Sequence, residues 1–378
     1  MSAPAPLAGI TVVDISRNVP GPYASLLLAR LGAEVVTVTG GPTGEALPEL
    51  SVGKRSVTLN LRSQPGVEAL HALVRDADVF LEGFRPGVAE RLGAGYAQLS
   101  EVNPRLVYCS LTGYGQDGPA RERAGHDINY LALTGVLGCL GPPDGPPLPP
   151  LNLVADLGSG GLWAVLGILG ALLERERTGR GRFVDAAMVD GVLSMMGTWF
   201  AAWGTSVLPG RGRGLVGGEA PFYRCYRCAD GRYVAVGAIE PKFFAALWRL
   251  LDLAGPVPDH LDPDTWPALT ETLAARFAER DRDAWAALAE SVDACLTPVL
   301  EPSEVADHPH MGRRVSVSRA GVDPFPRVDW LGHADPVPRA DCTEEVLRRA
   351  GLSEEAVAAV RRANADLSGP ALRWPPLR

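Results

Sequence analysis

The run Ile10-Thr11-Val12-Val13-Asp14, continued by Pro20-Gly21-Pro22 and then Glu34-Val35-Val36-Thr37-Val38-Thr39, decides the fold. Both apolar runs are typical of buried strands, and the segment 23–31 between them has the apolar spacing of an amphipathic helix. The same alternation continues at least to residue 112, with helices expected at 66–75 and 88–92 and strands at 79–82 and 106–111. Strands that alternate with short helices predict a parallel sheet covered by helices on both faces.

The pattern changes after a segment rich in glycine and arginine at 209–219. The segment 220–238 predicts a hairpin whose turn is Ala229-Asp230-Gly231-Arg232, and helical segments and a short strand follow it. We therefore predict an α/β chain with a Rossmann-like large domain and a smaller α+β domain. The expected regions are a large domain at 1–208, a linker at 209–219, a small domain at 220–320, and a return linker with a C-terminal helix that packs on the large domain at 321–378.

Composition narrows the class of protein. The 378 residues are 46% hydrophobic and carry a formal net charge of −8, which argues against nucleic acid as a partner. The start of the chain lacks a basic region followed by an apolar core, so we expect a cytoplasmic protein with reduced thiols. No run reaches the roughly 18 apolar residues of a membrane span. We expect no membrane contact, and we expect 157–178 to form one long buried helix.

Two titratable residues frame the central stretch from Gly125 to Asp156. It opens with Gly125-His126-Asp127 ahead of an apolar helical segment at 128–140, and Asp156 stands where the long helix is expected to begin. A histidine titrates near neutral pH, and burial can bring a carboxylate into the same range. We therefore hypothesise that His126 and Asp156 face each other across a substrate carbon and move a proton.

Each of these residues also has a structural interpretation. A lone histidine is more often a surface or core residue than a catalyst, and an aspartate directly before a helix is usually an N-cap. The functional alternative is a glycine-rich helix start whose N–H groups stabilise an oxyanion or enolate. Under that alternative Gly158, Gly160 and Gly161 let a ligand approach closely.

Cysteine and histidine pairs do not indicate a metal. Cys225 and Cys228 lie three positions apart in an expected strand, so they point to opposite faces, and no second cysteine pair exists to complete a zinc site. His308 and His310 lack further ligands of the usual spacing. We expect structural roles and no metal.

Basic residues gather at three places, and two of them directly follow an expected strand. The residues are Lys54, Arg55, Arg85 and Arg91. Ligands of open α/β sheets bind outside the carboxyl ends of the strands. In an acidic chain these cations indicate a polyphosphate site, with solvated surface as the alternative.

Several phrases together resemble the family III CoA-transferase superfamily over most of the chain, and within it the racemase branch. They are Pro20-Gly21-Pro22, Gly53-Lys54-Arg55-Ser56-Val57, Phe84-Arg85-Pro86-Gly87, Gly125-His126-Asp127 and Val154-Ala155-Asp156. In that superfamily the aspartate matching Asp156 carries acyl groups in transferases, and the histidine matching His126 marks the racemases. The resemblance also implies Glu240 as a third catalytic residue from the small domain, an interlocked homodimer, and an acyl-CoA substrate whose CoA part is a handle rather than a cofactor.

The implied reaction is a 1,1-proton transfer at the α-carbon of a 2-methylacyl-CoA thioester through an enolate. One base removes the α-proton, and the opposite acid returns a proton to the other face. Two alternatives stay open: a CoA-transferase with Asp156 as nucleophile, and a CoA-independent acid–base isomerase or cyclase that acts on a carbonyl-bearing natural product.

One departure from the superfamily pattern concerns CoA itself. Relatives usually carry basic residues just after the second strand, where they hold the adenine nucleotide, but this chain has Thr37 and Gly40 there. A charge-assisted hydrogen bond contributes roughly 1.5–3 kcal/mol. The loss of two would weaken CoA binding unless the cations at Lys54, Arg55, Arg85 and Arg91 compensate.

Overall fold

The computed structural model describes residues 5–40, 48–314, 317–318, 321–322 and 341–367. The chain divides into two compact units. The first consists of 1–134, 150–195 and 318–378, and the second of 135–149 and 196–317. The domain boundaries expected from the sequence stay a prediction, and most of the expected return linker lies outside the described residues.

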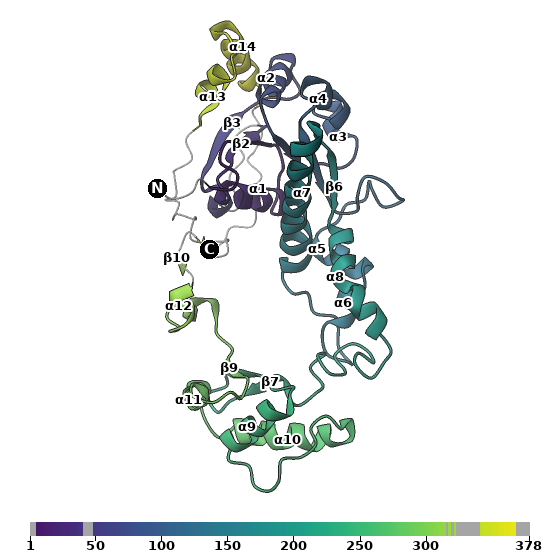
Figure 1. Ribbon diagram of the computed structural model, residues 1–378, viewed down its shortest axis with the longest axis vertical. Helices are drawn as coiled ribbons and strands as arrows, with labels where there is room; N and C mark the ends of the chain where they lie inside the picture. The colour runs from purple at the N-terminus through teal and green to yellow at the C-terminus, as the bar shows by residue number, and fades with distance from the viewer. Residues whose placement is uncertain (1–4, 41–47, 315–316, 319–320, 323–340, 368–378) are drawn as a thin grey trace. The chain divides into compact units, whose positions relative to one another are not determined.

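A six-stranded parallel sheet forms the centre of the first unit, in the order β3-β2-β1-β4-β5-β6 (Figure 1). Its strands are β1 (Thr11–Asp14), β2 (Glu34–Thr39), β3 (Lys54–Thr58), β4 (Val79–Glu82), β5 (Val107–Thr112) and β6 (Phe183–Ala187). The sheet confirms the predicted α/β class. The strand order reverses between β1 and β4, and ligands of such sheets bind at the carboxyl ends of the strands at this point.

Helices cover both faces of this sheet because successive strand residues point to opposite sides. Val12 belongs to the core formed with α1 (Pro20–Arg30) and α7 (Trp163–Thr178), whereas Val13 belongs to the opposite core. The helices of that opposite core are α2 (Gln64–Arg75), α4 (Tyr96–Val102), α13 (Thr343–Arg349) and α14 (Glu354–Asn364). The remaining α-helices that begin in the first unit are α3 (Val88–Arg91), α5 (Asp127–Leu133) and α8 (Met188–Ala202), and a 3₁₀ turn spans Pro48–Ser51.

The helix expected at 157–178 differs from the prediction in two respects. A π-helical segment, η2 (Leu153–Leu162), runs directly into α7, which ends at Gly179 in the left-handed conformation. Leu162, Leu166 and Leu173 are 51%, 60% and 73% exposed, so the expectation of a helix buried all round is wrong. By length and composition alone, Leu153–Thr178 is the one helix among the described residues that could cross a membrane.

Glycines let α1 pack closely against η2. A Cβ at Gly161 would lie 2.5 Å from Cδ1 of Tyr23, and a Cβ at Gly160 would lie 3.0 Å from Cβ of Pro20. These two glycines therefore allow α1 to lie close to η2. The expectation that they also let a ligand approach closely stays a prediction.

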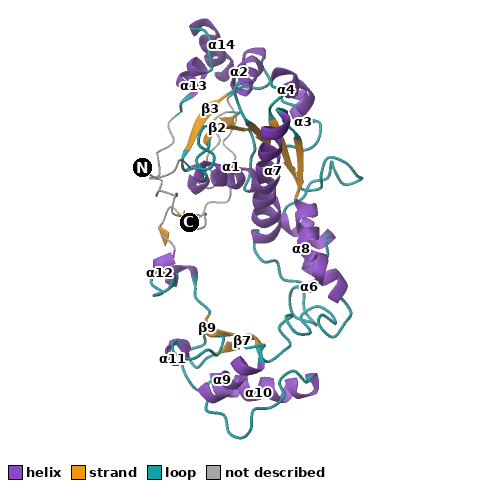
Figure 2. Ribbon diagram, in the orientation of Figure 1, coloured by secondary structure: helices purple, strands orange, loops and turns teal. Residues whose placement is uncertain are grey.

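The second unit is a small α+β structure (Figure 2). Its antiparallel sheet has the order β7-β8-β9, with β7 (Tyr223–Arg227), β8 (Tyr233–Gly237) and β9 (Leu296–Pro298). Its α-helices are α6 (Val136–Cys139), α9 (Pro241–Leu250), α10 (Trp266–Phe277), α11 (Arg282–Ala289) and α12 (Met311–Arg314), with 3₁₀ turns at Pro263–Thr265 and Pro302–Glu304. Two short strands, β10 (Val317–Ser318) and β11 (Gly321–Val322), pair with each other where the chain passes from the second unit to the first after Val317. The predicted hairpin is confirmed.

The cysteine pair has the arrangement expected from strand geometry. Cys225 is exposed and Cys228 is buried, and no disulfide bond joins any of the cysteines within the described residues. Within the described ranges no group of three or more His, Cys, Asp or Glu side chains is arranged to hold a metal ion.

The packing of α1 on η2 gives a matched pair of variants. We expect Gly161→Ala to lower the free energy of unfolding by about 1–3 kcal/mol, because the added methyl group overlaps Tyr23. Gly170→Ala lies in the same helical run, where an added Cβ meets nothing within 4 Å. It should raise stability by about 0.5–1 kcal/mol through helix propensity. Urea denaturation measures both, and a Gly161→Ala protein as stable as wild type would contradict the packing argument.

Candidate active site

His126 lies at the N-cap position of α5, in extended backbone, with its side chain exposed. Its backbone N–H donates to Oδ1 of Asn129 at 3.0 Å. The preceding loop is fixed by the hydroxyl of Tyr130, which donates to the carbonyl of Gly125 at 2.7 Å. The imidazole is therefore held on a defined helix start and faces solvent.

Asp127 connects this helix start to the segment that contains Asp156. One of its carboxylate oxygens, Oδ2, accepts hydrogen bonds from the N–H groups of Ala155 at 2.8 Å and Asp156 at 2.9 Å. Both N–H groups lie in the first turn of η2, where a helix has no internal acceptors. Asp127 is 5% exposed. A buried side chain from α5 thus caps the helix that carries Asp156.

Asp156 is a half-buried side chain in this first turn and is not an N-cap, so the N-cap interpretation is wrong. Asn152 occupies the N-cap position, and its Nδ2 donates to Oδ2 of Asp156 at 3.2 Å. Burial raises the pKa of Asp156 above its usual range, and the charge of Asp127 acts in the same direction. The Asn152 hydrogen bond and the charge of His126 oppose this increase in pKa. His126 and Asp156 therefore interact electrostatically within one unit.

The other predicted catalytic residue lies in the second unit. Glu240 is exposed at the N-cap position of α9, and its side chain makes no capping hydrogen bond. Its charge contributes, after burial, to a raised pKa of the Cys295 thiol. The role of Glu240 in catalysis stays a prediction, as does a role of the glycine-rich segment of η2 in enolate binding.

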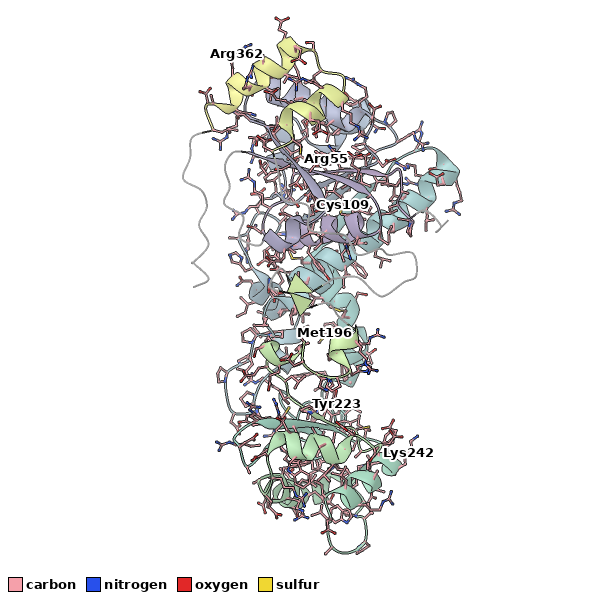
Figure 3. The ribbon with its side chains drawn as sticks, turned by 90° about the vertical axis from the view of Figure 1, so that its left-hand side faces the viewer. Arg55, Cys109, Met196, Tyr223, Lys242 and Arg362 are labelled. Carbon is pink, nitrogen blue, oxygen red and sulfur yellow. The ribbon has the colours of Figure 1, made fainter. Side chains whose placement is uncertain are left out.

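Two of the four predicted phosphate-binding cations are held by short hydrogen bonds or ion pairs. Nζ of Lys54 donates to the carbonyl of Pro22 and to Oγ of Ser25, both at 2.7 Å. Burial lowers the pKa of Lys54 to about 8, and the charge of Asp14 only partly offsets this. Arg55, on β3 (Figure 3), pairs with Glu345 at 2.6 Å. Both cations lie against neighbouring elements of the first unit.

The other two cations are exposed beyond β4. Nη1 of Arg85 makes one long contact, 3.5 Å, to the carbonyl of Glu122, and Arg91 ends the short helix α3. The loop that carries Arg85 is anchored by Glu82, whose carboxylate accepts from the N–H of Phe84 at 2.7 Å. Burial raises the pKa of Glu82 to about 7, against the effect of its hydrogen bond from Ser110.

Arg17 was missed by sequence reasoning. It follows β1 as Arg85 follows β4, so position after a strand was the signal that could have found it. Its guanidinium lies over the ring of Phe84, 5.6 Å from the ring centroid. The structure therefore places one further cation at the reversal point of the sheet.

The chain belongs to CoA-transferase family III, whose profile matches residues 7–331. It is 42% identical over 371 residues to the α-methylacyl-CoA racemase of Mus musculus, covering 93% of this chain and 95% of that protein. It is 40% identical over 363 residues to the α-methylacyl-CoA racemase of Homo sapiens, with the same coverage.

Solved structures agree with this assignment. A CAIB/BAIF family protein from Brucella suis matches with a TM-score of 0.76 and 28% identity, covering 97% of this chain and all of that one. Rv3272 from M. tuberculosis matches with a TM-score of 0.73 and 29% identity over 90% of this chain and 97% of that one. The fold and the family are thus supported by two kinds of similarity.

The capping role of Asp127 can be tested by substitution. Asp127→Ala leaves two N–H groups in η2 without an acceptor, which costs about 1–3 kcal/mol for each buried group. We expect a lower melting temperature and a reduced kcat, because the backbone that positions Asp156 is released. Asp127→Asn retains an acceptor oxygen, so its melting temperature and kcat should fall less than those of Asp127→Ala. The exposed carboxylate of Asp76 supplies the control, and equal effects of Asp76→Ala and Asp127→Ala would contradict the capping role.

Proposed function

We propose that this protein is a racemase that catalyses 1,1-proton transfer at the α-carbon of a 2-methylacyl-CoA thioester. The observation that carries this proposal is the joint placement of His126 and Asp156. They stand on two elements of one unit that the Asp127 carboxylate ties together, and their charges interact. The similarity to α-methylacyl-CoA racemases supports the same reaction.

The chemistry follows from having two different bases. One base takes the α-proton, and the electron pair of the C–H bond moves into the thioester carbonyl to give an enolate. The conjugate acid of the other base then delivers a proton to the opposite face of the same carbon. The raised pKa of Asp156 suits this exchange, because a carboxyl group that titrates closer to the working pH can both accept and donate a proton.

Isotope exchange tests the reaction. In D₂O the native protein should place deuterium at the α-carbon of a 2-methylacyl-CoA, as followed by mass spectrometry. We expect His126→Ala and Asp156→Ala each to lose at least about a hundredfold in the rate of racemisation, since a missing general acid or base typically costs about 10²–10⁴-fold. Near-normal racemisation by either variant would refute the two-base mechanism.

A second candidate function is acyl-group transfer, because the family profile is that of CoA-transferases and Asp156 offers a carboxylate. Covalent transfer would leave an acyl group on Asp156, which hydroxylamine trapping and mass spectrometry detect. That adduct without α-exchange would establish the transferase. A third candidate, a CoA-independent isomerase or cyclase, has its support in Thr37 and Gly40, and absence of CoA binding would favour it.

We also propose that the protein functions as a homodimer in the cytoplasm. Exposed leucines along η2 and α7 support an assembly, since soluble chains rarely leave a row of large apolar side chains in water. They are Leu153, Leu162, Leu166 and Leu173. Sedimentation equilibrium should give twice the chain mass, and Leu166→Arg should shift the protein toward the monomer. A monomeric native protein at micromolar concentration would refute the assembly.

A further inference from the structure

We infer that Arg17 binds a phosphate group of the CoA part of the substrate. This inference rests on the proposed function, because it takes an acyl-CoA as the ligand. Arg17 is not one of the four cations that the sequence motifs indicated. The inference follows from where the fold places its guanidinium.

Arg17 stands at the reversal point of the sheet. It comes three residues after the end of β1, and Phe84, whose ring its guanidinium covers at 5.6 Å, comes two residues after the end of β4. β1 and β4 are the neighbouring strands between which the strand order reverses. Ligands of open α/β sheets bind in the crevice outside the carboxyl ends of such strands.

Gly40 leaves room for this side chain on the other side of β1. It directly follows β2, and a Cβ built on it would lie 2.9 Å from Nη2 of Arg17. A side chain at position 40 would therefore meet the end of the Arg17 side chain, which would have to move from its present position. The guanidinium of Arg17 thus lies beside the position where relatives are expected to carry a cation and this chain has Gly40. The positive charge comes from the loop after β1 instead of the loop after β2.

The guanidinium is also available to a ligand. Arg17 is exposed, and no residue in the described part of the chain gives it a hydrogen bond or an ion pair. Lys54 and Arg55 differ in this respect, because their charges meet Ser25, Pro22 and Glu345. Stacking on an aromatic ring orients a guanidinium while its edge N–H groups stay free for the bidentate contact that phosphate favours.

The start of α1 adds a second favourable feature to the same loop. This helix of 11 residues begins at Pro20, and its N-cap residue Val19 offers no side-chain acceptor. The positive end of the helix dipole therefore lies three residues from Arg17 and favours a bound anion. Because Pro20 and Pro22 have no N–H group, the N–H of Gly21 is the one donor that the first three helical residues offer. The Arg17 guanidinium, the Phe84 ring that orients it and the start of α1 together form a candidate anion site on the loop after β1.

Calorimetric titration with two ligands tests the role of Arg17. Native protein and the Arg17→Gln, Arg17→Lys and Arg75→Gln variants are titrated with CoA and with pantetheine, which shares the thiol arm but has no phosphate. We expect Arg17→Gln to raise the Kd for CoA about tenfold or more, as the loss of one charged hydrogen bond predicts. The Kd for pantetheine should not change. Arg17→Lys should retain part of the affinity. Arg75→Gln changes an exposed arginine in the last turn of α2, which leads into the amino end of β4, and it should alter the affinity less than about twofold.

Two results would overturn the inference. One is equal CoA affinity of native protein and Arg17→Gln, and the other is a native protein that does not bind CoA. A loss of affinity for both ligands would mark a distorted fold and would also count against a phosphate contact. The proposed reaction fails separately, because a protein that binds CoA through Arg17 but exchanges no α-proton refutes the racemase and leaves the phosphate contact intact.

Discussion

The arrangement of the candidate active site depends on one buried carboxylate. Asp127 accepts the N–H groups of Ala155 and Asp156, and in doing so it satisfies donors that a helix start would otherwise leave unpaired. The interaction joins two segments about 28 residues apart in sequence. His126 precedes Asp127 and Asp156 supplies one of the two N–H groups, so both candidate bases are positioned by the same pair of hydrogen bonds.

A second set of contacts fixes α1 on the sheet. The carboxylate of Asp14 accepts from the hydroxyls of Ser16 and Ser25, and Ser25 in turn accepts from Lys54. A buried ammonium is costly unless it is paired and fully hydrogen-bonded, which explains why burial lowers the pKa of Lys54 while the ion stays anchored. On its other side α1 packs against Gly160 and Gly161.

The cations of the first unit fall into two groups, those held by neighbouring protein groups and those exposed to solvent. Arg55 is held between Glu34 and Glu345, which connects the sheet to the C-terminal helices, and Lys54 is buried. Arg17, Arg85 and Arg91 stay exposed beyond the ends of β1 and β4. These three exposed arginines can form charge-assisted hydrogen bonds with a ligand at less cost than Lys54 and Arg55, which would first have to break their bonds to the protein.

The sequence alone determined the parallel sheet and the hairpin of the second unit, because apolar runs and turn residues are local signals. It also singled out His126 and Asp156 as candidate bases, and their pairing across a substrate stays a prediction. It missed β3, since Lys54-Arg55-Ser56 reads as a basic surface segment until Ser25 and Asp14 are brought beside it. The sequence also offered an N-cap role for Asp156, but Asn152 occupies the N-cap position of η2. The packing of Gly160 and Gly161 against α1 could not be read from the sequence. The roles of Asp127 and Arg17 were decided by tertiary structure alone. Each depends on contacts with residues more than 20 positions away, and such contacts leave no periodicity in the chain.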